Sequence, residues 1–281
     1  MSEPALCGLV LAGGRSSRMH RDKAALAYHG RSQLAATFEL LESVVERCYV
    51  SVRADQTDEP LRKGFAQIVD VEGPGGPING ILAAQQHHPQ AAWLVLACDL
   101  PFLDRASLVH LLAERDRSRV ATTFRSSHDG LPEPLCAVYE TTAAKALQRF
   151  VAGGGRCPRK FLLTHEVMLV EPLVPTALDN INSAQEYWQA METLSPDTRN
   201  APRTLTVQYF ALLREQAGCS AETVRSTART PAELYAELAA RHPFSLPQDM
   251  LKVAINAEFG DWAQPLAEGD TVVFIPPVAG G

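Results

Sequence analysis

Several patterns are missing from this chain of 281 residues, and each absence excludes a class of protein. No apolar run reaches the roughly 18 residues of a membrane-spanning helix, and the first residues do not have the pattern of a signal peptide. The six cysteines form no C-x-x-C pair, which argues against a zinc site or a disulfide framework. We therefore expect a cytoplasmic protein that crosses no membrane, with cysteines that are mostly small buried apolar residues.

Positive charge is not concentrated anywhere along the chain. The 26 Lys and Arg residues are scattered among 32 Asp and Glu residues, and the net charge is −6. A nucleic-acid-binding protein normally carries a basic patch or stripe, so no nucleic-acid partner is expected. A hydrophobic fraction of 46% is typical of a globular protein, and the length fits two domains.

The apolar pattern divides the chain at a polar segment with two prolines, residues 194–203, which we interpret as a linker. In residues 1–193, continuous apolar runs, typical of strands covered on both faces, alternate with helical patterns. This alternation predicts a doubly wound α/β domain with a mainly parallel sheet. The expected strands are residues 6–11, 48–52, 67–71, 93–97, 120–123 and 135–139, and the expected helices are 33–47, 78–86, 107–115 and 142–151.

Residues 204–281 have a different pattern, with apolar runs at 205–212, 251–256 and 271–275 and one main helical segment at 231–241. This pattern predicts a small α+β domain that is rich in strands. No repeat or low-complexity segment interrupts it.

A loop rich in glycine and serine follows directly on the first expected strand. Residues 11–23 read LAGGRSSRMHRDK, and such a loop can present backbone N–H groups to phosphates while Arg18 and Lys23 neutralise their charge. The loop matches neither the G-x-x-x-x-G-K-[ST] phosphate loop nor the G-x-G-x-x-G dinucleotide loop. We interpret it as a nucleotide-binding loop of another kind; a tight turn with solvated basic side chains is the alternative.

Further polar candidates lie at the ends of expected strands. Asp99 could hold Mg²⁺, which proteins usually bind through one or two carboxylates plus substrate phosphates; a helix N-cap is its alternative role. Asp70 precedes the glycine-rich segment 73–80. Asn180 and Asn182 would face the same way in an extended segment. Asp70 and the two asparagines could equally be turn residues.

These motifs occur in an order that resembles the molybdenum cofactor guanylyltransferases (MobA family) of the nucleotidyltransferase fold. The matching segments are the loop at 11–23, G-G-P-I-N-G at 75–80, C-D-L-P at 98–101 and N-I-N at 180–182. Members of that family attach GMP from GTP to the phosphate of molybdopterin. The resemblance covers residues 1 to about 193, and it implies GTP and molybdopterin as substrates and Mg²⁺ as cofactor.

The resemblance also implies a role for individual residues. Asp99 would hold the metal, Lys23 and Arg18 would stabilise the charge on the reacting phosphates, and the pterin would lie against Asn180 and Asn182. The residues implied to contact the nucleotide are Leu11, Ala12, Gly13, Gly14, Lys23, Ser51, Asp70 and Asp99.

Two alternatives to a guanylyltransferase stay open. Related cytidylyltransferases usually carry L-A-A-G where residues 11–14 read L-A-G-G, and the missing Cβ favours a purine base. Three positions depart from the family pattern: His20 replaces a usual glycine, Ser51 stands where asparagine is common, and Arg53 adds a charge. The alternatives are therefore a cytidylyltransferase, or a first domain without catalytic activity joined to a sulfur carrier.

The chain ends in two glycines, Gly280 and Gly281. Glycine permits almost any backbone dihedral, so this carboxylate could enter a narrow active site of another protein, although two glycines taken alone favour a frayed end. An acidic turn, E-G-D at 268–270, precedes the last expected strand, and Pro276 and Pro277 stop strand pairing after it. A tail is therefore expected to leave the sheet.

Residues 204–281 resemble the small subunit of molybdopterin synthase, the MoaD family of ubiquitin-like (β-grasp) sulfur carriers. The match includes residues 206–215, 253–256 and 266–281. The resemblance implies that an E1-like enzyme adenylates the carboxylate of Gly281. It also implies that the carboxylate becomes a thiocarboxylate and delivers sulfur inside the large synthase subunit. Phe210 and Phe274 are expected in the core rather than on the partner surface.

Overall fold

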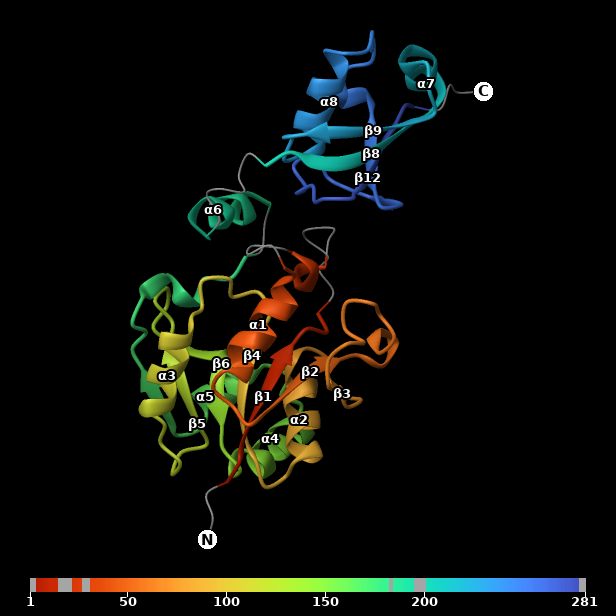
Figure 1. The fold of residues 1–281 in the computed structure, drawn as a ribbon. Helices are drawn as coiled ribbons and strands as arrows, with labels where there is room; N and C mark the ends of the chain where they lie inside the picture. The colour runs from red at the N-terminus through yellow and green to blue at the C-terminus, as the bar shows by residue number, and fades with distance from the viewer. Residues whose placement is uncertain (1–3, 15–21, 27–30, 182–183, 195–200, 278–281) are drawn as a thin grey trace. The chain divides into compact units, whose positions relative to one another are not determined.

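The computed structural model describes residues 4–14, 22–26, 31–181, 184–194 and 201–277. These residues divide into two compact units: the first ends at Ile181, and the second begins with helix α6 (Ala184–Leu194) (Figure 1). The predicted linker, residues 194–203, is described only at its two ends, so its extent stays a prediction. Within these ranges no helix combines the length and apolar character that a bilayer crossing requires.

The first unit contains a seven-stranded sheet, and its strands are β1 (Leu6–Leu11), β2 (Arg47–Val52), β3 (Gln67–Val69), β4 (Ala92–Ala97), β5 (Ala121–Arg125), β6 (Pro132–Tyr139) and β7 (Val167–Val170). Their order is β3-β2-β1-β4-β6-β5-β7. Strands β1 to β4 pair in parallel, β7 is parallel to β5, and β6 is antiparallel to both of its neighbours. The prediction of a mainly parallel sheet is therefore confirmed.

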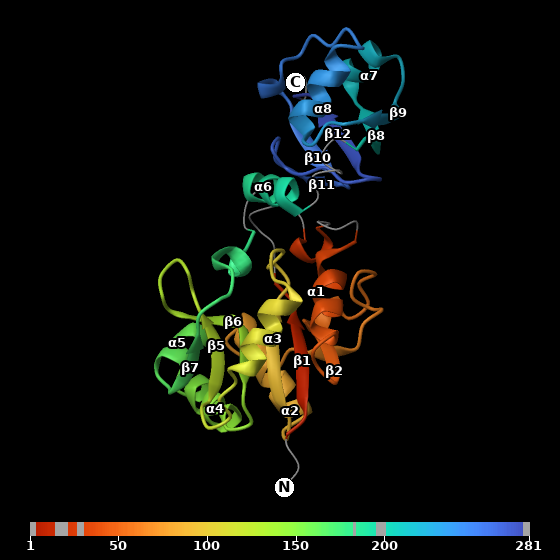
Figure 2. The same ribbon diagram turned by 60° about the vertical axis from the view of Figure 1, so that its left-hand side comes forward.

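Helices cover both faces of this sheet, namely α1 (Gln33–Glu42), α2 (Pro77–His87), α3 (Arg105–Ala113), α4 (Ala143–Ala152) and α5 (Pro158–Leu163) (Figures 1 and 2). Successive strand residues point to opposite faces, so β1 contributes Val10 to a core shared with α1 and α3, and Leu9 to a core shared with α2, α4 and α5. Burial on both faces explains why these strands are continuously apolar.

In the first unit the structure shifts several predicted element boundaries and adds elements that were not predicted. Helix α1 ends at Glu42 instead of residue 47, because the chain must turn into β2 at Arg47. Strand β7 and helix α5 were not predicted at all. Both are short, with four and six residues, whereas apolar periodicity is read over a window of roughly 11 to 18 residues.

The second unit has its own five-stranded sheet, formed by β8 (Arg203–Tyr209), β9 (Ala221–Ser226), β10 (Lys252–Ile255), β11 (Glu258–Phe259) and β12 (Thr271–Ile275). The order is β11-β10-β12-β8-β9, and the central pair β8 and β12 is parallel. Helix α8 (Pro231–Ala239) shares one apolar core with this sheet, and α7 (Ala211–Ala217) follows β8. The predicted ubiquitin-like α+β fold is confirmed.

The acidic turn before β12 holds the start of the closing strand. Asp270 is only 4% exposed; its Oδ2 accepts from the backbone N of Ala267 at 2.7 Å, and its Oδ1 accepts from Nδ2 of Asn256 at 2.9 Å. Strand β12 ends at Ile275, immediately before the two prolines, as predicted. Gly281, the proposed sulfur-carrying residue, lies outside the described residues.

The two phenylalanines that were expected in the second core differ in their environments. Phe274 is fully buried, whereas Phe210 is 51% exposed. The prediction was wrong for Phe210 because Val207 and Tyr209 occupy the inward positions of β8, and period-two alternation turns the next residue outward. Four cysteines are buried and unpaired as expected, whereas Cys219 is partly buried and Cys157 is exposed.

Candidate functional site

The glycine-rich loop leaves the sheet at the carboxyl end of β1, between β2 and β4. The backbone N of Ala12 donates to the Ser51 carbonyl, and the backbone N of Cys98 donates to the Leu11 carbonyl, each over 3.4 Å. Ser51, near the end of β2, and Asp99, just after β4, therefore lie next to the loop. Ligands of open α/β sheets bind at this edge. Arg18 and His20 lie outside the described residues.

A buried arginine that the sequence analysis missed holds this loop in place. Arg62 is 1% exposed, and its Nε and Nη2 donate to the Ala12 carbonyl at 3.1 and 2.7 Å. Its Nη2 also lies 2.6 Å from Oδ2 of Asp22, and its Nη1 pairs with Glu59. A guanidinium offers five donors in a fixed fork, so one side chain can bridge the two ends of the loop. An isolated arginine outside any motif gives no sequence signal for this role.

Lys23 and Asp99 form the ion pair of the site. The side chain of Asp22 accepts from the backbone N of Ala24 at 3.0 Å and thus caps the turn that carries Lys23. Lys23 Nζ lies 3.0 Å from Asp99 Oδ2, and the two side chains are 20% and 23% exposed. The N-cap of α3 is Asp104, so the alternative interpretation of Asp99 as a helix cap is wrong. Both charged groups remain within reach of a ligand.

Asp70 lies on the other side of the loop, where Ser51 Oγ donates a hydrogen bond to its Oδ1. Helix α2 comes very close here: a Cβ on Gly80 would lie 2.3 Å from Ser51 Oγ and 2.9 Å from a Leu11 methyl carbon. Only glycine allows this approach. Burial raises the pKa of the Asp70 carboxyl above its ordinary value, while the Ser51 hydrogen bond and the Arg53 charge partly oppose the shift.

Gly13 faces Asp70 across a narrow gap. A Cβ on Gly13 would lie 3.4 Å from Asp70 Oδ2 and 3.5 Å from Gln56 Oε1. Gln56 is 4% exposed and accepts from the backbone N of Arg53 at 3.2 Å, while Arg53 Nη1 donates to the Gly13 carbonyl. Two acceptor oxygens are thus positioned beside a loop residue without a side chain. At Gly14, in contrast, an added Cβ would meet nothing within 4 Å.

A small cavity of about 200 Å³ is lined by both Asp99 and Asn180. The backbone N of Ile181 donates to the Asp99 carbonyl at 3.3 Å, which ties the two segments together. Asn182 lies outside the described residues. The cavity is also lined by ionisable side chains that the sequence analysis did not single out: His128, Asp129, Glu133, Arg159 and Asp179.

These ionisable side chains contact one another in pairs. Arg159 lies 2.9 Å from Asp129 Oδ2 and also pairs with Glu133, and His128 Nε2 lies 2.9 Å from Asp179 Oδ1. Burial raises the pKa of the Glu133 carboxyl, and the Arg159 charge partly opposes this. The cavity therefore has a polar lining of both charge signs.

The donor set is compatible with Mg²⁺ that is shared with a substrate. Among the described residues, no group of three or more His, Cys, Asp and Glu side chains is arranged to hold a metal alone. Mg²⁺, however, is commonly bound by one carboxylate together with phosphate oxygens and water. Asp99, at the sheet edge and partly exposed, fits that mode of binding.

Residues 8–167 match the family model described as a MobA-like NTP transferase domain. The chain belongs to this family. Residues 207–281 match the ThiS family. The predicted combination of a MobA-like unit with a ubiquitin-like unit of the sulfur-carrier type is confirmed.

Two relatives each match about two thirds of the chain. A molybdenum cofactor biosynthesis bifunctional protein from Synechocystis sp. is 33% identical over 189 residues, which are 67% of this chain but only 54% of that relative. A molybdenum cofactor guanylyltransferase from Rhizobium meliloti is 35% identical over 198 residues, covering 65% of this chain and 88% of that protein.

The fold of the first unit also has a solved counterpart. The structure of molybdopterin-guanine dinucleotide biosynthesis protein A from Archaeoglobus fulgidus superposes with a TM-score of 0.57 and 26% identity. The superposition covers 68% of this chain and 99% of that one. The whole of that protein therefore corresponds to about two thirds of this chain.

Proposed function

We propose that the first unit transfers GMP from GTP to the terminal phosphate of molybdopterin, and that the second unit carries sulfur as a thiocarboxylate on Gly281. The proposal depends chiefly on one observation: Lys23, Asp99 and the glycine-rich loop converge at one sheet edge of a MobA-like unit. The name of the Rhizobium meliloti relative, a molybdenum cofactor guanylyltransferase, supports guanine as the base. The ThiS-family match supports the second activity.

The transfer step is a direct displacement at phosphorus. A terminal phosphate oxygen of molybdopterin attacks the α-phosphorus of GTP in line, the bond between the α-phosphorus and its bridging oxygen breaks, and pyrophosphate leaves. Lys23 and Arg18 offset the charge on the phosphate oxygens. Asp99 would hold Mg²⁺, which when bound neutralises further phosphate charge. Arg62 keeps the loop carbonyl of Ala12 turned inward, so that the loop N–H groups remain available to the phosphates.

Guanine fits the acceptors next to Gly13 better than cytosine does. Guanine presents two adjacent donors, its N1–H and its 2-amino group, whereas cytosine presents only one amino group. Asp70 Oδ2 and Gln56 Oε1 lie on the side of the loop that a residue with a Cβ would partly fill. A carboxylate accepts two hydrogen bonds at once, and we therefore assign the guanine edge to Asp70.

The acceptor substrate, molybdopterin, is assigned to the cavity lined by Asp99 and Asn180. Asn180 lines that cavity together with polar residues of both signs, which suits a pterin with donor and acceptor groups. Asn182 is assigned to the same substrate by its spacing from Asn180. An entering molybdopterin phosphate would then approach Asp99 from this cavity.

The second unit acts as a carrier whose reacting group is the chain terminus. A carboxylate is a poor electrophile, so an E1-like enzyme would first convert that of Gly281 to an acyl adenylate, from which AMP leaves when a sulfur nucleophile attacks. The thiocarboxylate would then donate its sulfur within the large subunit of molybdopterin synthase. Pro276 and Pro277 end the pairing of β12 just before this tail.

The transferase assignment is tested by incubating the full chain with Mg²⁺, molybdopterin and either GTP or CTP, followed by chromatography of the dinucleotide. We expect product with GTP and little with CTP. Lys23→Ala and Asp99→Asn should each lower the rate of transfer by about 10²- to 10³-fold, because each removes a group that stabilises developing charge.

Asp104→Asn is the matched control. It removes a carboxylate from the same connection between β4 and α3, but asparagine caps a helix about as well as aspartate. This variant should keep both its stability and its transfer rate. Unimpaired transfer by Lys23→Ala would overturn the mechanism, and absence of product with both nucleotides would favour a first unit without catalytic activity.

A further inference from the structure

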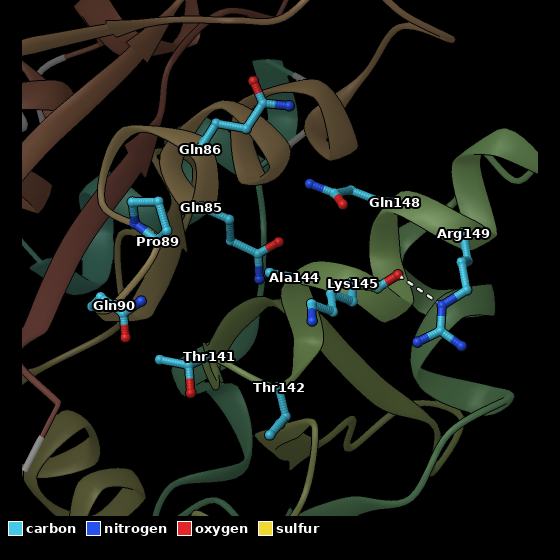
Figure 3. Close-up of a pocket in the computed structure, with 10 residues that line it drawn as sticks. All are labelled: Gln85, Gln86, Pro89, Gln90, Thr141, Thr142, Ala144, Lys145, Gln148 and Arg149. Atoms are coloured by element: carbon cyan, nitrogen blue, oxygen red, sulfur yellow. Dashed lines mark hydrogen bonds between the residues drawn. The ribbon is translucent and has the colours of Figure 1, made fainter. Parts of the chain in front are cut away.

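A second pocket, of about 730 Å³, lies between α2 and α4 (Figure 3). Its walls come from the last turn of α2, the segment that follows it, the two threonines that precede α4, and the first two turns of α4. The volume is within the range of small-molecule sites in proteins. The side chains that can bond to a ligand there include Gln85, Gln86, Gln90, Thr141, Lys145 and Arg149.

This pocket is separate from the proposed nucleotide site. Gly80, at the start of α2, contacts Ser51 and Leu11 beside the glycine-rich loop. Gln85 comes five residues later, about 8 Å along the helix axis, and the remaining wall residues of α2 lie farther still. None of the residues assigned to GTP, metal or pterin lines this second pocket.

Gln85 is the unusual feature of the pocket. Its side chain is 5% exposed, and neither its Oε1 nor its Nε2 has a hydrogen-bond partner among the described residues. Figure 3 shows the amide pointing from α2 toward the first turn of α4. Burying a polar group without a hydrogen bond is unfavourable, so such groups are few in folded proteins. This amide is therefore positioned to bond a ligand that offers it one donor and one acceptor.

The charges at the pocket favour an anion. Lys145 and Arg149 lie one turn apart on the same side of α4, and both are exposed. Arg149 Nε donates to the Lys145 carbonyl at 3.3 Å, which holds the guanidinium near the pocket (Figure 3). None of the described residues that line the pocket is acidic. Two adjacent cations without a counter-charge raise the local concentration of anionic ligands.

We propose that this pocket binds a small organic anion, with a phosphate group at Lys145 and Arg149 and a planar donor–acceptor edge at Gln85. Nucleoside monophosphates combine these two features, because a base edge pairs with a glutamine amide and a phosphate pairs with exposed cations. The inference depends on the pocket alone and does not require the transfer reaction of the other site.

The experiment titrates the full chain with AMP, GMP, CMP and inorganic phosphate by calorimetry, and locates each ligand by hydrogen exchange. We expect saturable binding of at least one monophosphate, with protection of amides in residues 82–90 and 143–149. Gln85→Leu and the double variant Lys145→Gln/Arg149→Gln should each weaken that binding about tenfold or more. The double variant Arg156→Gln/Lys160→Gln, which removes two exposed cations outside the pocket, should bind normally.

A thermal melt separates a ligand-binding amide from a structural one. Leucine keeps the approximate volume of glutamine and removes the unpartnered amide, so Gln85→Leu should melt at the same temperature or higher. A lower melting temperature with unchanged binding would assign the amide to a buried water, and the proposal would be wrong. The proposal is equally overturned if no probe binds saturably, if inorganic phosphate alone binds, or if the variants bind as the parent does.

Discussion

The two units of this chain place their chemistry in opposite ways. In the first unit, the proposed site is assembled from segments far apart in sequence: the loop at Ala12, the buried Arg62 and the ion pair of Lys23 with Asp99. In the second unit, the proposed reacting group is the terminal residue, Gly281, and the described residues form the scaffold that carries it. An enzyme site must hold several groups in one geometry, whereas a carrier must present one end to other proteins.

Deleting Gly281 should give the largest effect, and it should abolish the activity of the second unit without affecting that of the first. Thiocarboxylate formation by an E1-like enzyme with a sulfur donor should fall below detection, because the carboxylate would no longer reach the adenylating site. The rate of GMP transfer should be unchanged. Intact-mass spectrometry and the dinucleotide assay measure the two outcomes. Sulfur found on a cysteine of the parent chain, instead of at the terminus, would contradict the carrier assignment.

Two phenylalanine truncations test whether the stability of the second unit depends on its buried core alone. Phe274→Ala removes a fully buried ring and should lower the free energy of unfolding of this unit by about 3–5 kcal/mol. Phe210→Ala removes a half-exposed ring and should change it by no more than about 0.5 kcal/mol. Urea unfolding followed by hydrogen exchange in the second unit measures both. Equal losses would show that exposure does not distinguish the two rings.

Truncating Arg62 tests whether the stability of the first unit and its affinity for GTP depend on buried polar contacts. Arg62→Ala leaves the Ala12 carbonyl without its two donors and should cost about 1–3 kcal/mol of stability. It should also raise the KM for GTP, because the loop loses its support. Arg241→Ala, which breaks an exposed pair with Glu237 in the second unit, should cost less than about 0.5 kcal/mol. An Arg62→Ala protein with normal stability and KM would disprove the positioning role.

The smallest expected effect is a change in the pH dependence of GTP affinity. Burial raises the folded-state pKa of Asp70, so its charged form should be lost, and GTP binding weakened, at a higher pH than for an ordinary aspartate. Ser51→Ala removes a hydrogen bond that lowers this pKa and should move the midpoint to still higher pH. Titrations of GTP binding against pH measure both shifts. A midpoint that moves down in Ser51→Ala would contradict the assignment.

The raised pKa of Asp70 also makes the stability of the folded state depend on pH. Because the folded pKa of Asp70 exceeds the unfolded one, the folded state retains this proton longer, and the contribution of Asp70 to stability is lost as pH rises through the folded pKa. Asp70→Asn should therefore be at least as stable as the parent chain at neutral pH. Such a variant should nevertheless bind GTP more weakly, which separates function from folding at this position.

Much of the fold could be predicted because burial imposes a pattern on the sequence. Strands covered on both faces must be continuously apolar, and the alternation of such runs with helical periods indicated the doubly wound sheet. The shortest elements were not predicted in this way. The four residues of β7 and the six of α5 are too few for periodicity to identify an element, and their existence depends on the neighbours against which they pack.

The candidate site was only partly predictable. Lys23 and Asp99 belong to recognisable motifs, and the structure brings them to within 3.0 Å of each other. Arg62 and Gln56 belong to no motif, yet both are almost fully buried next to the loop. A polar residue acquires such a role from the groups that it meets in space, and those groups are remote in the sequence.

The sequence by itself determined the two fold classes, the position of the glycine-rich loop and the end of the last strand at two prolines. These follow from local requirements: apolar periodicity, glycine where the backbone must be free, and proline where pairing must stop. Only the tertiary structure decided which buried polar groups are satisfied. Among the residues that the structure describes, it provided Arg62 with three partners and left the amide of Gln85 with none, because hydrogen bonds depend on the distances and angles between segments that folding brings together.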